Sequence, residues 1–126
     1  MPKRTDFTDW VEEQLAPLGV IRIKSMFGGF GVYADDLFFA IVDDDVLFFK
    51  ADELNRDRFV EAGAALFTYP TKDGMQQSLS YYAAPDSALD DQTELLEWAR
   101  LGLDAALRAR AVKSRKKTKS DSPPPR

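Results

Sequence analysis

The chain has 126 residues, which is enough for one domain of ordinary size. It contains no cysteine and no histidine, which excludes a disulfide framework, thiolate or imidazole metal ligands, and histidine acid–base chemistry. The formal net charge of −4 joins two unlike regions: residues 110–126 have seven basic residues and one acidic residue, a net +6, whereas residues 1–109 have ten basic and twenty acidic residues, a net −10.

Apolar residues at helical spacing predict a first helix close to the N-terminus. Thr5 or Asp6 can cap its start. Pro17 and Gly19 should end it, because proline disrupts the preceding turn and glycine accepts a left-handed exit. The apolar positions of this helix are Phe7, Trp10, Val11, Leu15 and Leu18.

Four short segments rich in β-branched and aromatic residues follow, separated by turn-forming residues. These predicted strands are residues 20–26, 30–34, 37–43 and 46–50. The aspartate-rich breaks between them are short enough for hairpins, so we expect an antiparallel meander. The third strand is apolar on both faces and should lie centrally in the sheet.

A second, shorter helix is predicted over residues 52–62. Asp52 is expected to cap it, and Gly63 should stop it. Phe59 and Val60 are the residues that we expect to be buried.

Two further strands and a long helix complete the domain. The strands are expected at residues 66–69 and 75–83, joined by a turn that contains Pro70, and the helix at residues 90–110. The element order is therefore αββββαββα. We expect a two-layer α+β fold in which an antiparallel sheet of about five to six strands packs with helices.

The C-terminal end differs from the body in composition. We assign residues 1–112 to the folded domain and residues 113–126 to a disordered basic tail that ends in prolines, because no apolar residue there can anchor it. A solubility tail and a nonspecific nucleic-acid contact are the two interpretations of its charge. The candidate nucleic-acid residues are Lys113, Arg115, Lys116, Lys117 and Lys119.

A glycine-rich segment lies between the first two predicted strands. It consists of Met26, Phe27, Gly28, Gly29 and Gly31, with Phe30 among them. A phosphate-binding loop would be followed by a helix, whereas here a strand follows. We therefore interpret the segment as a bend or bulge where backbones approach closely, with a peptide or small-ligand contact as the alternative.

The remaining polar clusters do not form a catalytic or metal pattern. The aspartate pairs lack the alternating spacing of a calcium loop and are interpreted as turn residues and helix caps. Ser78 and Ser80 share a strand face but have no histidine to activate them, which leaves only carboxylates or Lys50 for an enzyme. We predict no catalytic residues, no metal, no cofactor and no enzymatic activity.

A surface site on the body, if there is one, is expected around basic and aromatic residues of the sheet. The candidate interaction residues are Arg22, Lys24, Lys50, Arg56 and Tyr82. No apolar run approaches the ~20 residues that span a bilayer, and residues 1–9 lack the apolar core of a signal peptide. We therefore expect a cytoplasmic protein.

Six segments in a fixed order carry a resemblance to a known family. They read MFGGFGVY at 26–33, LFFA at 37–40, LFFKAD at 47–52, FTY at 67–69, SYYAAP at 80–85 and WAR at 98–100. Their order and spacing across residues 5–108 resemble the N-terminal domain of the TfoX/Sxy family of competence regulators. Asp36 departs from the pattern, because the family commonly has glycine there.

The resemblance implies a bacterial cytoplasmic α+β protein that regulates transcription through protein partners. Full-length competence regulators add a C-terminal domain similar to helix-hairpin-helix modules, for which this sequence has only the basic tail. We therefore expect an interaction module that binds a protein partner, either an activator or its own copy, with weak DNA contact by the tail. The alternative is a small-molecule or peptide sensor with a groove between sheet and helix, lined by Tyr33, Phe48 and Tyr82.

Overall fold

The computed structural model describes residues 5–26, 29–71 and 74–121. Its six strands form one antiparallel sheet in the order β1-β2-β3-β4-β6-β5. The strands are β1 (Ile21–Met26), β2 (Gly29–Ala34), β3 (Leu37–Asp43), β4 (Val46–Lys50), β5 (Leu66–Thr71) and β6 (Gly74–Ala83). The first four strands form the expected meander, and β6 then pairs with the free edge of β4.

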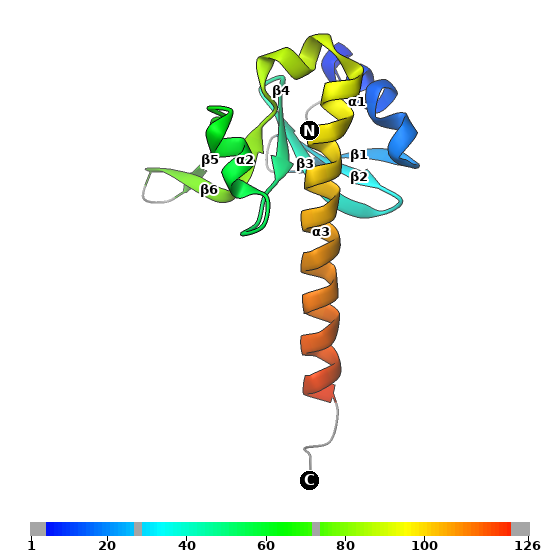
Figure 1. Cartoon of the computed structure of the whole chain (residues 1–126), viewed down its shortest axis with the longest axis vertical. Helices are drawn as coiled ribbons and strands as arrows, with labels where there is room; N and C mark the ends of the chain where they lie inside the picture. Colours follow the sequence, from blue (N-terminus) through cyan, green and yellow to red (C-terminus); the bar gives the residue numbers. More distant parts are fainter. Residues whose placement is uncertain (1–4, 27–28, 72–73, 122–126) are drawn as a thin grey trace.

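Helices pack on one face of this sheet. They are α1 (Asp6–Leu15), α2 (Arg56–Glu61) and α3 (Gln92–Asp121), together with the short 3-10 helices η1 (Ala16–Leu18) and η2 (Asp86–Asp90). Helix α3 contacts β3 and β4, and α1 contacts β1 and the beginning of α3 (Figure 1). Figure 1 also shows α3 projecting well beyond the sheet. The two-layer α+β fold and its element order are as predicted.

The start of α1 is fixed by two threonines. Thr5, the first of the two expected caps, accepts a hydrogen bond from the Thr8 backbone N–H at its Oγ1 (3.1 Å), and the Thr5 backbone N–H donates to Thr8 Oγ1 (2.8 Å). This reciprocal pair satisfies backbone donors that the first turn leaves free. The chain leaves the helical region at Gly19, whose φ of 142° suits glycine.

Two aspartate pairs form the tight turns of the meander. Asp35 and Asp36 join β2 to β3, and Asp44 and Asp45 join β3 to β4. All four have positive φ, between 48° and 69°, as two-residue hairpin turns require. Asp35 Oδ1 also accepts a hydrogen bond from the Val20 N–H (2.9 Å). The expected role of these aspartates in turns is confirmed.

The core lies between the helices and the sheet. Phe39 of β3, Phe49 of β4 and Phe59 of α2 are fully buried in it. Helix α3 approaches these strands closely at Gly102, where an added Cβ would lie 3.2 Å from both the Phe39 carbonyl oxygen and the Phe49 Cβ. A larger residue at position 102 would therefore push α3 away from the sheet.

The second helix differs from the prediction. It begins at Arg56 and not at Asp52, because Asp52 Oδ1 accepts hydrogen bonds from the N–H groups of Leu54 (3.0 Å) and Asn55 (3.3 Å) and so stabilises a turn before the helix. Phe59 is buried as expected. The prediction for Val60 is wrong: its side chain is 55% exposed, because a helix this short buries only one narrow face.

Two other elements, β5 and α3, are longer than predicted. Pro70 lies within β5 and not in a turn, a position that proline tolerates because β5 is an edge strand. Helix α3 continues past the expected end near residue 110 to Asp121, so the backbone of residues 113–121 is helical where we expected disorder. Lysine, arginine and alanine are good helix formers, and no proline interrupts them before Pro123. The division into a domain and a tail stays a prediction.

In the part of the chain that the structure describes, none of the helices combines the length and the apolarity needed to cross a membrane.

The glycines of the β1–β2 junction are used for close packing. An added Cβ at Gly29 would lie 2.6 Å from the Val42 carbonyl oxygen, and one at Gly31 would lie 2.5 Å from the Met26 sulfur. The predicted close approach of backbones is thus found at Gly29. At Gly31 the nearest neighbour is the end of a flexible side chain. Phe27 and Gly28 lie outside the described residues.

This difference predicts unequal costs for two alanine substitutions. Gly29→Ala should lower the free energy of unfolding by about 1–3 kcal/mol, because the backbone of β3 cannot move aside. Gly31→Ala should cost less, because Met26 can change rotamer. Urea denaturation followed by circular dichroism measures both; equal costs would contradict the assignment.

Candidate functional site

One face of the sheet is not covered by the helices. Lys24 pairs with Gly31, Gly31 with Ile41, Ile41 with Phe48, and Phe48 with Ala83. Directly paired residues of antiparallel strands point to the same side. This side is opposite to the main core, and it has its own apolar cluster of Ile41, Phe48 and Tyr81 with Phe38, Phe67 and Ala83. We call it the open face.

A β-bulge places Phe38 on the open face. Val32 pairs with Ala40 and Tyr33 pairs with Phe38, so Phe39 is an extra residue in β3. The bulge lets both Phe39 and Ala40 enter the main core while Phe38 turns to the other side. The bulge therefore puts Phe38 on the open face in place of Phe39, which strict alternation along β3 would have put there.

Aromatic rings and lysines form a continuous row on the open face. The ring centroids of Tyr33 and Phe38 are 5.2 Å apart, and those of Phe38 and Tyr81 are 5.9 Å apart. Lys24 Nζ lies 4.8 Å from the Tyr33 ring centroid, and Lys50 Nζ lies 5.3 Å from the Tyr81 ring centroid. These are cation–π distances, so each end of the row presents a positive charge held against a ring.

The Tyr81 hydroxyl is neutral at all physiological pH values. Burial, and to a lesser extent the nearby Tyr33, raises the pKa of Tyr81 to about 12. Tyr81 therefore adds no charge to this part of the open face.

The structure brings together three of the five candidate interaction residues. Arg22, which pairs with Tyr33, lies on the open face with Lys24 and Lys50. Arg22 Nε makes an exposed ion pair with Asp36 Oδ1 at 3.7 Å. Tyr82 is not on a surface: it is 5% exposed and stacks on Phe59 in the main core, at 5.5 Å between ring centroids. Its neighbour Tyr81 takes the position on the open face.

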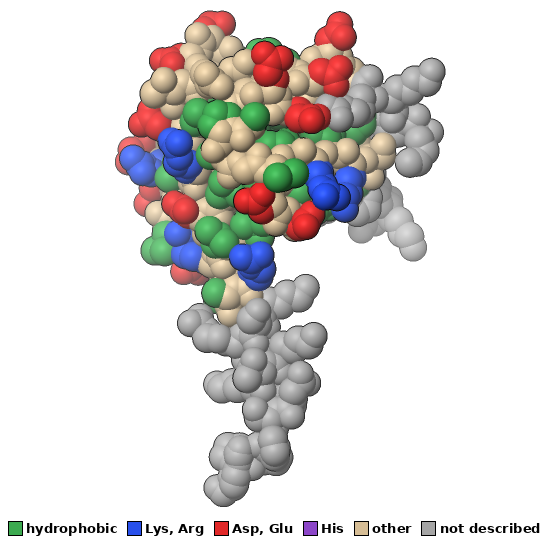
Figure 2. Space-filling view, turned by 90° about the vertical axis from the view of Figure 1, so that its right-hand side faces the viewer, with side chains coloured by type: hydrophobic (Ala, Val, Ile, Leu, Met, Phe, Trp, Pro, Cys, Tyr) green, Lys and Arg blue, Asp and Glu red, His purple; other side chains and the backbone are tan. Residues whose placement is uncertain are grey.

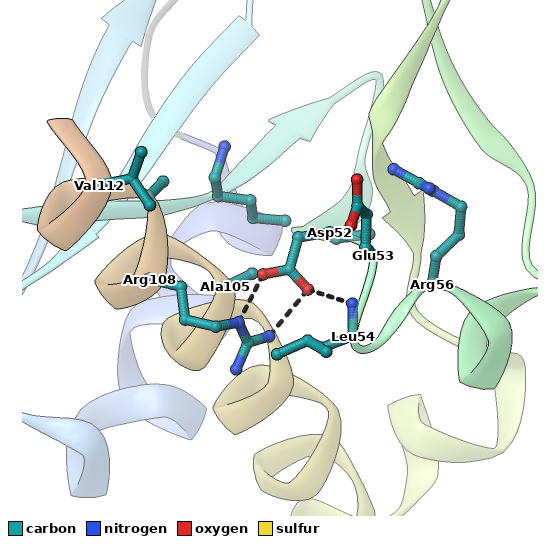
Figure 3. Close-up of a pocket in the computed structure, with 10 residues that line it drawn as sticks. Asp52, Glu53, Leu54, Arg56, Ala105, Arg108 and Val112 are labelled. Atoms are coloured by element: carbon teal, nitrogen blue, oxygen red, sulfur yellow. Dashed lines mark hydrogen bonds and ion pairs between the residues drawn. The ribbon is translucent and has the colours of Figure 1, made fainter. Parts of the chain in front are cut away.

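The expected aromatic groove between sheet and helix is not formed by the residues named for it. Tyr33 and Phe48 lie on the open face, and Tyr82 lies in the core between sheet and helices. A different cleft, with a volume of about 640 Å³, lies between α3 and the segment that joins β4 to α2 (Figure 3). It is lined by Lys50, Ala51, Asp52, Glu53, Leu54, Arg56, Ala105, Arg108, Ala109 and Val112. Arg56, the fifth candidate, lies here.

An ion pair joins the two sides of this cleft. Arg108 Nε donates to Asp52 Oδ2 (2.6 Å), and Arg108 Nη2 donates to Asp52 Oδ1 (2.8 Å). Figure 3 shows this two-pronged contact reaching from α3 to the turn before α2. The hydrogen bond from Arg108, followed by those from the Leu54 and Asn55 N–H groups, lowers the pKa of Asp52, although partial burial opposes this. The same contact raises the pKa of Arg108.

The remaining candidates from the sequence are the basic residues of 113–119, the two serines of β6 and the acidic clusters. The backbone of the five basic candidates between 113 and 119 is helical, and the side chains of that segment and of Ser78 and Ser80 lie outside the description. Within the described residues, no three acidic side chains gather as metal ligands. On the side shown in Figure 2, the charged side chains near the upper end are acidic, and farther down basic and acidic side chains are interspersed.

The lowered pKa of Asp52 predicts a pH-dependent contribution to stability. A carboxyl group whose folded pKa lies below its unfolded value of 3.8 stabilises the fold above that value and loses this effect as the pH falls through the folded pKa. We expect Asp52→Asn to lower the free energy of unfolding by about 1 kcal/mol at pH 7, a modest value because both side chains are partly exposed.

Urea denaturation between pH 2 and pH 7 measures this difference, and Asp57→Asn, at an exposed position of α2, is the control. The difference between wild type and Asp52→Asn should be constant from pH 5 to pH 7 and shrink below the unfolded pKa. A difference that grows on acidification would contradict the ion pair.

Two sequence comparisons with known proteins identify the family of the chain. The family model described as the TfoX N-terminal domain matches residues 13–106. The protein Sxy of Escherichia coli (strain K12) is 32% identical over 112 residues, which are 89% of this chain and 53% of Sxy. The chain thus spans about half the length of the curated relative that it matches. With the family model matching most of the sequence, the chain belongs to the TfoX N-terminal domain family.

Proposed function

We propose that the chain is a regulatory interaction module whose open face binds an acidic, partly apolar segment of a protein partner. The observation that carries this proposal is the gathering of Arg22, Lys24 and Lys50 around an aromatic row, on a body whose residues 1–109 have a net charge of −10. Basic residues are the minority in this body, yet three of them share one face. Membership of the TfoX N-terminal domain family supports a regulatory role.

The chemistry of the open face indicates what kind of segment fits it. Lys24 and Lys50 have no carboxylate partner among the described residues, and their contacts to tyrosine rings leave ammonium hydrogens free. Tyr33 and Phe38 are only half-buried, so they can lose more surface to water on binding. An acidic segment with one or two apolar side chains would use both features, and complementary charge would also favour this partner over others.

The basic end of α3 supports a second, weaker contact with nucleic acid. A helical backbone through Asp121 would set out the basic residues of 113–119 along about two turns of helix. Such residues neutralise phosphates without reading sequence. The acidic body opposes close approach to a duplex, which makes this an auxiliary contact beside the protein partner.

Regulation without catalysis is the role that we propose. The chain has neither histidine nor cysteine, and its best-defined carboxylate, Asp52, is held in its charged form by Arg108 and so is not suited to donate a proton near neutral pH. The Tyr81 hydroxyl, with a pKa of about 12, is likewise not suited to act as a base.

Charge-reversal substitutions on the open face test whether this face binds the proposed partner. The full chain is used to capture proteins from a native bacterial lysate, and the dissociation constant of the identified partner is then measured. Lys24→Glu with Lys50→Glu should weaken binding at least about tenfold, because two attractive contacts become repulsive. Arg58→Glu with Arg100→Glu, at exposed positions on the helix-covered side, should change it less than about threefold. An equal loss of affinity in the two double variants would contradict the assignment of the open face as the binding surface.

Salt dependence tests the basic end of α3. Fluorescence anisotropy on promoter and scrambled duplexes should give equal affinities and a slope of log K against log salt no steeper than about −5. Replacing Lys113, Lys116, Lys117 and Lys119 by glutamine should reduce the slope by about 3 to 4. An unchanged slope, or a strong preference for the promoter, would refute nonspecific phosphate contact.

A further inference from the structure

One buried donor has no partner in the fold. The Nε atom of Arg56 is inaccessible to water and has no hydrogen-bond acceptor among the described residues. A buried donor without an acceptor destabilises a protein, and most such groups in folded proteins are satisfied. Arg56 is the first residue of α2 and lines the cleft between α3 and the β4–α2 segment. Arg56 is therefore a residue of the cleft wall, although its Nε atom is itself covered by protein atoms.

The cleft is open to solvent and has the volume of a small-molecule site. Its volume of about 640 Å³ falls within the range of roughly 300–1,000 Å³ that is typical of such sites. Much of its wall is apolar, formed by Ala51, Leu54, Ala105, Ala109 and Val112. Leu54 is 74% exposed and Val112 is 40% exposed, so both have apolar surface available for a ligand.

The charges of the cleft favour an anion. Asp52 is neutralised by Arg108, whereas Lys50 and Arg56 have no carboxylate partner among the described residues. Glu53 opposes them but is exposed and can turn toward solvent. Figure 3 shows the Arg56 guanidinium on the side of Glu53, directed away from the Asp52–Arg108 pair, so that pair does not occupy it.

We propose that this cleft binds a small organic anion, whose phosphate or carboxylate oxygens pair with Lys50 and Arg56 and whose apolar part lies against Leu54 and Val112. The site shares Lys50 with the open face, whereas Arg56, Leu54 and Val112 take no part in the function proposed above, so a substitution at Arg56 tests this site separately. The Asp52–Arg108 pair acts here as a positioning contact, because it holds the two walls of the cleft together.

Four probes separate the parts of this proposal. Phenyl phosphate and benzoate have an oxyanion and an apolar ring, inorganic phosphate has only the oxyanion, and phenol has only the ring. In ¹H–¹⁵N NMR titrations of the full chain, phenyl phosphate and benzoate should shift the amides of residues 50–56 and 105–112. Phenyl phosphate should bind at least about fivefold more tightly than inorganic phosphate, and phenol should leave these amides unshifted.

Two variants distinguish a binding role for Arg56 from a purely structural one. Arg56→Met removes the unsatisfied donor, so it should raise the melting temperature of the free protein, by about 2–4 °C, and weaken phenyl phosphate binding at least about tenfold. Arg58→Met, at an exposed position of the same helix, should change neither quantity.

Either of two results would overturn the proposal. One is the absence of shifts in the cleft, or shifts confined to other residues, at saturating phenyl phosphate. The other is unchanged affinity in Arg56→Met, or an equal loss in Arg58→Met, which would indicate attraction by general positive charge alone.

Discussion

Helix α3 packs closely on β3 and β4, and this packing determines how the rest of the molecule is arranged. Gly102 lets the helix backbone approach the strands, and the neighbouring Ala99 and Ala106 are also buried against the sheet. Polar contacts then fix the helix along its length: Asn55 Nδ2 donates to the Leu101 carbonyl oxygen (2.8 Å), and Arg108 binds Asp52. One face of the sheet is thereby covered, and the helix end continues beyond the domain (Figure 1).

Because the helices cover only one face of the sheet, alternate residues of its strands point to the open face. In β4, Phe49 enters the core while Phe48 and Lys50 belong to the open face. The same alternation in β6 divides Tyr82 from Tyr81. Lysines packed against the aromatic row prevent a large bare apolar patch and leave positive charge for the proposed partner.

Local pattern was sufficient for most of the fold but not for contacts between distant residues. The bounds of β3 and β4 follow from dense β-branched and aromatic residues between aspartate turns. Arg22 and Lys24 share a face because they are two residues apart in β1, whereas the position of Lys50 on that face depends on the register of three strand pairs. Of the adjacent Tyr81 and Tyr82, however, only the pairing of β6 with β4 decides which one enters the main core. The Asp52–Arg108 pair joins residues 56 positions apart, and no local signal marks it.

The central claim is that the helices cover one face and that the other face is available for binding. Hydroxyl-radical labelling with mass spectrometry tests it most directly at the adjacent residues Phe38 and Phe39, because Phe38 is half-buried on the open face and Phe39 is 0% exposed in the core. Phe38 and Tyr33 should be oxidised readily in the free chain and protected in the complex with its partner, whereas Phe39 should resist in both. Equal labelling of Phe38 and Phe39, or protection by the partner confined to α1 and α3, would contradict the account.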